Sequence, residues 1–189
     1  MNTPQPRFAA VSRWLHWSMA VMILAMLFIG VGMAASVSRR YEILVSIHRP
    51  LGLAILMLAV VRLVNRWVKP PPPLPGTLPR FQRFAAQISH YLLYALMFAL
   101  PLVGWAMLSA APYPIAIVGG LHLPPILSPD PLTYAGLRRF HTCLAYLLFA
   151  TIMVHVAAAM MHGLIRRDGV FDSMASWRRG KAGENGGRR

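Results

Sequence analysis

Six of the seven histidines in this chain lie in stretches of sequence that are otherwise almost entirely apolar. These six are His16, His48, His90, His141, His155 and His162. The remaining one, His122, lies in a connection rich in proline and glycine. An ionisable side chain in a membrane-spanning segment is costly and usually has a functional role. Imidazoles there can bind a metal, carry protons or form hydrogen bonds between helices, so these histidines are the candidates for chemistry.

Three of the candidates share one predicted helix. His141 and His155 are separated by 14 residues, which at about 100° per residue falls roughly 40° short of four full turns, with a rise of about 21 Å. His162 follows seven residues later, again near the same face. Because lipid solvates imidazole poorly, we expect this face to point into the protein, with one imidazole near each membrane surface.

Histidines at the ends of two other spans can pair with these by depth. His48 begins the second span at the expected level of His141, and His16 begins the first span at the expected level of His155. Two neutral imidazoles that face each other can be the axial ligands of a haem iron, and such a haem fills the core of a four-helix bundle. The pattern therefore predicts two haem sites, one near each membrane surface.

Three other interpretations of the histidines are open. A single intramembrane histidine often forms only an interhelical hydrogen bond. A chain of histidines can also relay protons, although the spans contain no Asp or Glu to alternate with them. A structural zinc site fits less well, because it needs four nitrogen or sulfur ligands close together and neither pair has such a set nearby.

The composition indicates that lipid is the solvent for most of the chain. Of its 189 residues, 57% are hydrophobic and 13% are charged, with a mean hydropathy of +0.52, whereas soluble domains have about 25% charged residues. Intrinsic disorder is excluded, and nucleic-acid binding does not fit so apolar a chain despite its net charge of +14. Four stretches are long enough to cross a bilayer as helices: Trp14–Ser36, Leu44–Trp67, Phe84–Ala111 and Phe140–Ile165.

The basic residues predict the orientation of this all-α, integral membrane four-helix bundle. Fourteen of the 19 Lys and Arg residues would lie on the side of the two termini, and five on the other side. These five are Arg39, Arg40, Arg49, Arg138 and Arg139. The positive-inside rule then places both termini in the cytoplasm. We expect a cytoplasmic N-terminus over residues 1–13, a transmembrane domain over 14–165 and a basic, flexible cytoplasmic tail over 166–189.

Short motifs in all four spans resemble those of the bacterial cytochrome b561 family. They are Arg13–Trp17, Ile47–Gly52, Val60–Leu63, Ser89–Tyr94, Ala99–Gly104, Phe140–His141 and Val154–Ala159. Each motif is weak alone, but their order and spacing are specific as a set. The family is akin to the cytochrome b subunits of membrane hydrogenases and formate dehydrogenases. The resemblance implies a multi-pass protein of the bacterial inner membrane that holds two b haems and exchanges electrons with ubiquinone.

The resemblance also implies roles for single residues. It gives the same ligands as the pairing by depth, namely His48 and His141 for the outer haem and His16 and His155 for the inner haem. His90 and His162 match family positions beside the inner haem. We interpret these two as quinone-pocket residues, or as alternative ligands in place of His16.

Arginines near the two predicted haem sites are candidate partners for the haem propionates. Arg49 and Arg138 would serve the outer haem, and Arg13 and Arg62 the inner haem. The branch of the family with this length and layout includes superoxide oxidase, which transfers electrons from superoxide outside the membrane to ubiquinone. The outer side has five arginines and only two acidic residues, and its net positive charge would attract such a small anion. Superoxide:ubiquinone oxidoreductase activity is therefore what the resemblance leads us to expect.

Two other functions are compatible with the sequence. One is an electron-transfer subunit docked on a dehydrogenase or hydrogenase, in which case the outer donor is a redox protein. The other is a non-redox transporter or proton relay with structural histidines. A homodimer is also compatible with the sequence, but no pattern in it indicates one.

Overall fold

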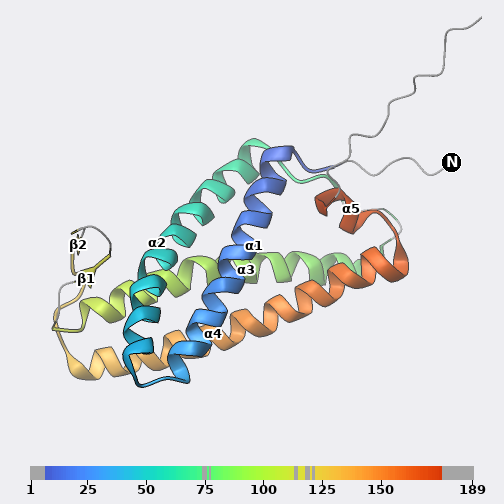
Figure 1. The fold of residues 1–189 in the computed structure, drawn as a ribbon. Helices are drawn as coiled ribbons and strands as arrows, with labels where there is room; N and C mark the ends of the chain where they lie inside the picture. Colours follow the sequence, from blue (N-terminus) through green and yellow to red (C-terminus); the bar gives the residue numbers. More distant parts are fainter. Residues whose placement is uncertain are drawn as a thin grey trace, which may run out of the picture.

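The computed structural model describes residues 7–73, 76, 78–112, 115–117, 120 and 122–175. Its long helices (Figure 1) are α1 (Ala10–Ala34), α2 (Arg39–Val68), α3 (Arg80–Ser109) and α4 (Pro131–Met160). A π-helical segment continues α4 and precedes a short helix; these are η1 (Met161–Arg166) and α5 (Val170–Ala175). Two short strands lie between α3 and α4, namely β1 (Ile115–Ala116) and β2 (His122–Leu123).

The long helices are long and apolar enough to cross a membrane. Large apolar side chains on their outer faces are exposed rather than buried, as surface in contact with lipid should be. Phe28 on α1 and Val154 on α4, for example, are 77% and 66% exposed. The chain is therefore an integral membrane four-helix bundle, and this part of the prediction is confirmed.

The bundle consists of two helical hairpins. Helix α1 packs mainly against α2, and α3 packs mainly against α4. Figure 1 shows the α1–α2 hairpin crossing the α3–α4 hairpin at a clear angle. Contacts between α2 and α3 join the two hairpins. Side chains from both hairpins therefore line the interior.

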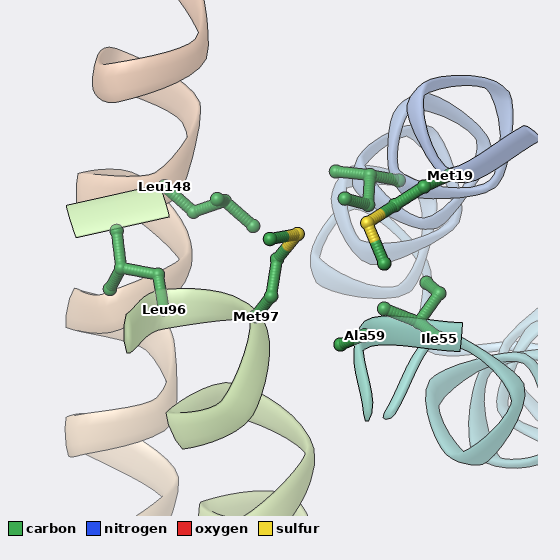
Figure 2. Close-up of a cluster of buried hydrophobic side chains, with 7 residues drawn as sticks. Met19, Ile55, Ala59, Leu96, Met97 and Leu148 are labelled. Atoms are coloured by element: carbon green, nitrogen blue, oxygen red, sulfur yellow. The ribbon is translucent and has the colours of Figure 1, made fainter. Parts of the chain in front are cut away.

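Buried apolar side chains from all four long helices form the centre of the bundle. They are Met19 and Ile23 of α1, Ile55 and Ala59 of α2, Leu96 and Met97 of α3, and Leu148 of α4. Figure 2 shows how side chains from the two hairpins approach one another in this cluster. Leu148 lies midway along α4 between His141 and His155. The apolar core therefore separates the histidines at the two ends of the bundle.

Helix α4 begins at Pro131, well before the predicted start at Phe140. Its N-cap is Asp130, whose carboxylate accepts a hydrogen bond of 2.7 Å from the Thr133 backbone N–H. Proline suits the first helical position because it has no N–H to leave unpaired. Hydrogen bonds from Thr133 lower the pKa of Asp130 below its usual value. An apolar run marks only the part of a helix that lies in the membrane, so the predicted first residue of α4 lies too late in the sequence.

Other connections also contain structure that the apolar pattern does not predict. Helices α2 and α3 begin at Arg39 and Arg80, a turn or more before their predicted apolar spans. Strands β1 and β2 pair antiparallel within the connection rich in proline and glycine that contains His122, with Ile115 opposite Leu123. The first part of the predicted tail forms the end of η1 and helix α5. The rest of that tail, from residue 176, lies outside the described residues.

Candidate functional site

Two histidines from different hairpins face each other near one end of the bundle. His48 on α2 and His141 on α4 have ring centres 6.2 Å apart, with 62° between the ring planes. Both side chains are half-buried. The Nδ1 atom of His48 is buried and has no hydrogen-bond partner among the described residues. A buried nitrogen without a partner is costly. The region between His48 and His141 is therefore suited to a group that binds imidazole.

Gly104 on α3 has no side chain and so leaves room for the imidazole ring of His141. A Cβ atom added to Gly104 would lie 3.4 Å from Cε1 and 3.7 Å from Nδ1 of His141. A methyl group there would make ordinary contact, but a longer side chain would overlap the imidazole ring. The absence of a side chain at this position therefore determines how closely His141 can approach α3.

Three histidines form a cluster near the opposite end of the bundle, and we call them the three-histidine cluster. His155 on α4 lies between the other two. Its ring centre is 6.4 Å from that of His16 on α1 and 5.5 Å from that of His90 on α3. The sequence predicted the approach of His16 to His155. It placed His90 beside this site only through the family resemblance.

The two pairs predicted by depth have the separation that a shared metal ion requires. Imidazole nitrogens bind metals at about 2 Å, so the centres of two rings on opposite sides of one ion lie about 6 Å apart. The His48–His141 and His16–His155 separations, 6.2 and 6.4 Å, agree with this value. Within the described residues, no three His, Cys, Asp or Glu side chains form a metal-binding group. The donors present thus suit a metal held by two imidazoles, as in a bis-histidine haem.

Arg62 on α2 binds one member of the three-histidine cluster. Its Nη2 lies 2.9 Å from Nδ1 of His16, and its guanidinium lies over the Tyr94 ring with Cζ 5.6 Å from the ring centre. Arginine can only donate, so Nδ1 of His16 accepts and Nε2 carries the proton of the neutral ring. A metal held at Nε2 would need the ring proton on Nδ1 instead, so this hydrogen bond would then have to break. The Arg62 guanidinium would in that case be available to an anionic group.

The other predicted arginines lie close to the histidines in sequence. Arg49 lines a cavity of ≈ 470 Å³ between the C-terminal end of α3 and the start of α4. Arg138 is exposed and lies one turn before His141. Arg13 lies one turn before His16, and its Nε atom is buried.

His162 has a different environment from the other intramembrane histidines. Its Nδ1 lies 2.6 Å from Oδ2 of Asp168, and both side chains are largely buried. The sequence analysis did not single out Asp168. The available signal was an acidic residue followed by Gly169, a turn-forming residue, shortly after the last histidine of the helix.

Comparison with known proteins shows which family the chain belongs to. A sequence model of the family described as prokaryotic cytochrome b561 matches residues 7–177, a range that includes all the long helices and both groups of histidines. The chain belongs to the prokaryotic cytochrome b561 family. It is thus a multi-pass electron-transfer protein of the bacterial inner membrane, and the family uses haem b. The family resemblance predicted from the sequence is confirmed.

Several curated relatives match nearly the whole length of this b561-family chain. Cytochrome b561 homolog 2 of Escherichia coli (strain K12) is 28% identical over 176 residues, covering 92% of this chain and 93% of the relative. Cytochrome b561 homolog 1 of the same strain is 27% identical, covering 86% and 93%. The probable superoxide oxidase CybB of Yersinia pestis is 25% identical, covering 92% and 98%.

Proposed function

We propose that the chain holds two b haems, one between His48 and His141 and one between His16 and His155. The observation that carries this proposal is the separation of the rings, 6.2 and 6.4 Å, at opposite ends of the bundle. Haem b supplies one-electron transfer where it is bound. The chain itself places the four imidazoles and fills the space between the pairs with apolar side chains.

The two pairs span most of the membrane. His141 and His155 lie on the same helix with a rise of about 21 Å between them, compared with a hydrocarbon core of about 30 Å. The distribution of basic residues supports an orientation with both termini in the cytoplasm. In this orientation the His48–His141 pair lies near the outer surface, and the three-histidine cluster lies near the cytoplasm.

Superoxide is the donor that the outer end favours. Arg49 lines the ≈ 470 Å³ cavity together with Asp130, so the excess positive charge of this end comes from the other outer arginines, such as the exposed Arg138. Positive charge of this kind attracts a small anion from solution. The match to a probable superoxide oxidase supports the same donor. Each superoxide that gives up one electron leaves as dioxygen.

Ubiquinone in the membrane is the acceptor we propose at the cytoplasmic end. Its reduction takes two electrons, from two superoxide ions, and two protons. His90 and His162 lie at this end and can bind or protonate a quinone oxygen. Arg62, once released from His16, can pair with an anionic group there.

The donor is tested by mixing superoxide with the oxidised protein in a stopped-flow instrument. The b-type absorbance bands should appear in the wild type, and failure of the haems to become reduced would contradict the proposal. Arg138→Glu should lower the second-order rate several-fold at low ionic strength, because it reverses one charge of the outer surface. The difference should shrink in high salt, where surface charges are screened.

A charge reversal on the other side of the membrane is the matched control. Arg80→Glu changes an exposed arginine at the start of α3, on the proposed cytoplasmic side. It should leave the rate with superoxide unchanged at both ionic strengths. Equal slowing in Arg138→Glu and Arg80→Glu would mean that net charge matters and the outer arginines do not.

Gly104→Leu is expected to weaken haem binding at the His48–His141 pair. A Cβ at this position already makes van der Waals contact with the His141 ring at 3.4 Å, so the larger leucine side chain is expected to crowd that ring. The haem content of the purified protein should fall toward one haem per chain. Gly30→Leu on α1 is the control, because nothing lies within 4 Å of its Cβ position. Full haem content in Gly104→Leu would show that haem binding does not depend on the space that Gly104 leaves beside His141.

A further inference from the structure

The C-terminal end of α4 turns back on the bundle and brings a carboxylate to His162. The segment η1 is π-helical, a rare conformation that often occurs at functional sites. Arg167 and Gly169 then have positive φ angles of 49° and 81°. Asp168 lies between them, and α5 follows, folded back beside the start of α1 (Figure 1). The backbone of the turn thus determines where the Asp168 carboxylate lies.

Both carboxylate oxygens of Asp168 have partners in this turn. Oδ2 lies 2.6 Å from Nδ1 of His162, and Oδ1 accepts a hydrogen bond of 3.2 Å from the Val170 N–H. The His162 and Asp168 side chains are only 13% and 18% exposed. Because an ionised carboxylate only accepts, Nδ1 of His162 carries the proton. This hydrogen bond leaves Nε2 as the nitrogen that can exchange a proton with another molecule.

Contacts with η1 and α1 hold the turn in place. A Cβ on Gly163 would lie 2.9 Å from Cγ of Phe171, so the phenyl ring packs directly on the η1 backbone. The indole Nε1–H of Trp17 donates to the Met174 carbonyl at 3.3 Å. The Trp17 ring in turn contacts that of His16, with 5.5 Å between ring centres. The turn therefore lies at the end of the bundle that holds the three-histidine cluster.

We propose that Asp168 is a positioning residue for proton transfer to the quinone, and that it acts through His162. This inference rests on the proposed function, in which quinone is reduced at this end. The carboxylate holds the Nδ1–H of His162, so that Nε2–H can be given to a quinone oxygen. Nε2 first takes up a proton from the aqueous phase, so that the ring is an imidazolium beside the Asp168 carboxylate. The Nε2–H bond then breaks as the quinone O–H bond forms, and the ring returns to the neutral form with its proton on Nδ1.

The electrons and protons of the overall reaction balance. Two superoxide ions supply two electrons and leave as two dioxygen molecules. The quinone gains these two electrons and two protons and becomes the quinol. One proton comes through His162, and the other comes from water. Asp168 transfers no proton in this sequence, because it acts only by orienting the imidazole and stabilising its charge.

The test compares two acceptors that differ in their need for protons. Haems reduced with dithionite, with the excess removed, are mixed with ubiquinone-1 or with ferricyanide, and their reoxidation is followed by absorbance. Asp168→Asn should slow reoxidation by ubiquinone-1 at least about tenfold, because general acid catalysis is impaired. It should leave reoxidation by ferricyanide unchanged, because ferricyanide takes up no proton. Asp168→Glu, which keeps a carboxylate, should restore much of the quinone rate.

A nearby acidic residue serves as the matched control. Asp172 is exposed on α5, and Asp172→Asn should leave both rates unchanged. Equal slowing with both acceptors, or loss of haem, in Asp168→Asn would show a structural role for the carboxylate and overturn the proposal. An unchanged quinone rate in Asp168→Asn would overturn it as well. Failure of the wild type to reduce ubiquinone-1 would instead refute the proposed function.

Discussion

Replacing His141 with alanine is expected to remove one of the two haems and leave the other bound. The ring of His141 lies 6.2 Å from that of His48, and no other histidine ring contact of His141 occurs among the described residues. Iron at this site would lose one of two axial ligands with no replacement nearby. The apolar core separates this pair from the three-histidine cluster, so the second site should keep its haem. Quantified haem should fall from about two to about one per chain.

His122→Ala is the matched control for this variant. His122 lies in β2, where its Nδ1 contacts the Gly120 carbonyl at 2.8 Å, away from the helix interior. Its replacement should leave the haem content unchanged. If His141→Ala kept both haems, His141 could not be an axial ligand. If it lost both, the two sites would not be independent.

Replacing His155 with alanine is expected to stop quinone reduction while the outer site still accepts electrons. His155 contacts both His16 and His90, so it is the shared member of either ligand pair at this end. Loss of a residue that only supports a metal ligand costs about 10–100-fold in activity. Because His155 would be the ligand itself, the rate of quinone reduction should fall by more than this. Superoxide should still reduce the remaining haem in a single turnover. Stopped-flow absorbance measures both the reduction of the remaining haem, without ubiquinone-1, and the reduction of quinone, with ubiquinone-1 present.

Single variants of the other two histidines in the cluster decide which of them pairs with His155. If His16 is the ligand, His16→Ala loses the inner haem and His90→Ala keeps it. The opposite result would assign the role to His90. Retention of the inner haem in His155→Ala would contradict both assignments. The 6.4 Å separation of the His16 and His155 rings is the reason that we expect the first result.

The main features of the fold and of the histidine pairs could be predicted from the sequence. Long apolar runs specify membrane helices because every backbone polar group must be paired inside lipid. The 14-residue interval between His141 and His155 specifies one face of a helix, and a position near a span end specifies depth. These rules suffice to bring His48 to His141 and His16 to His155.

Features that depend on helix crossing or on turns could not be predicted from the sequence. The crossing of α1 and α2 within one hairpin brings Arg62 to His16, and no sequence rule gives that crossing. The position of Asp168 depends on two residues with positive φ angles, of which only Gly169 is a signal in the sequence. The early start of α4 at Pro131 has a visible cap in Asp130, but an apolar run carries no information about it.

The haem content of the purified wild-type chain tests the central claim most directly. A dithionite-reduced-minus-oxidised spectrum, together with quantification of extracted haem, should show b-type bands and about two haems per chain. Two haems are expected because imidazole pairs of matching separation lie on both sides of the apolar core. A spectrum without b-type bands, or a fully loaded protein with a single haem, would contradict the account.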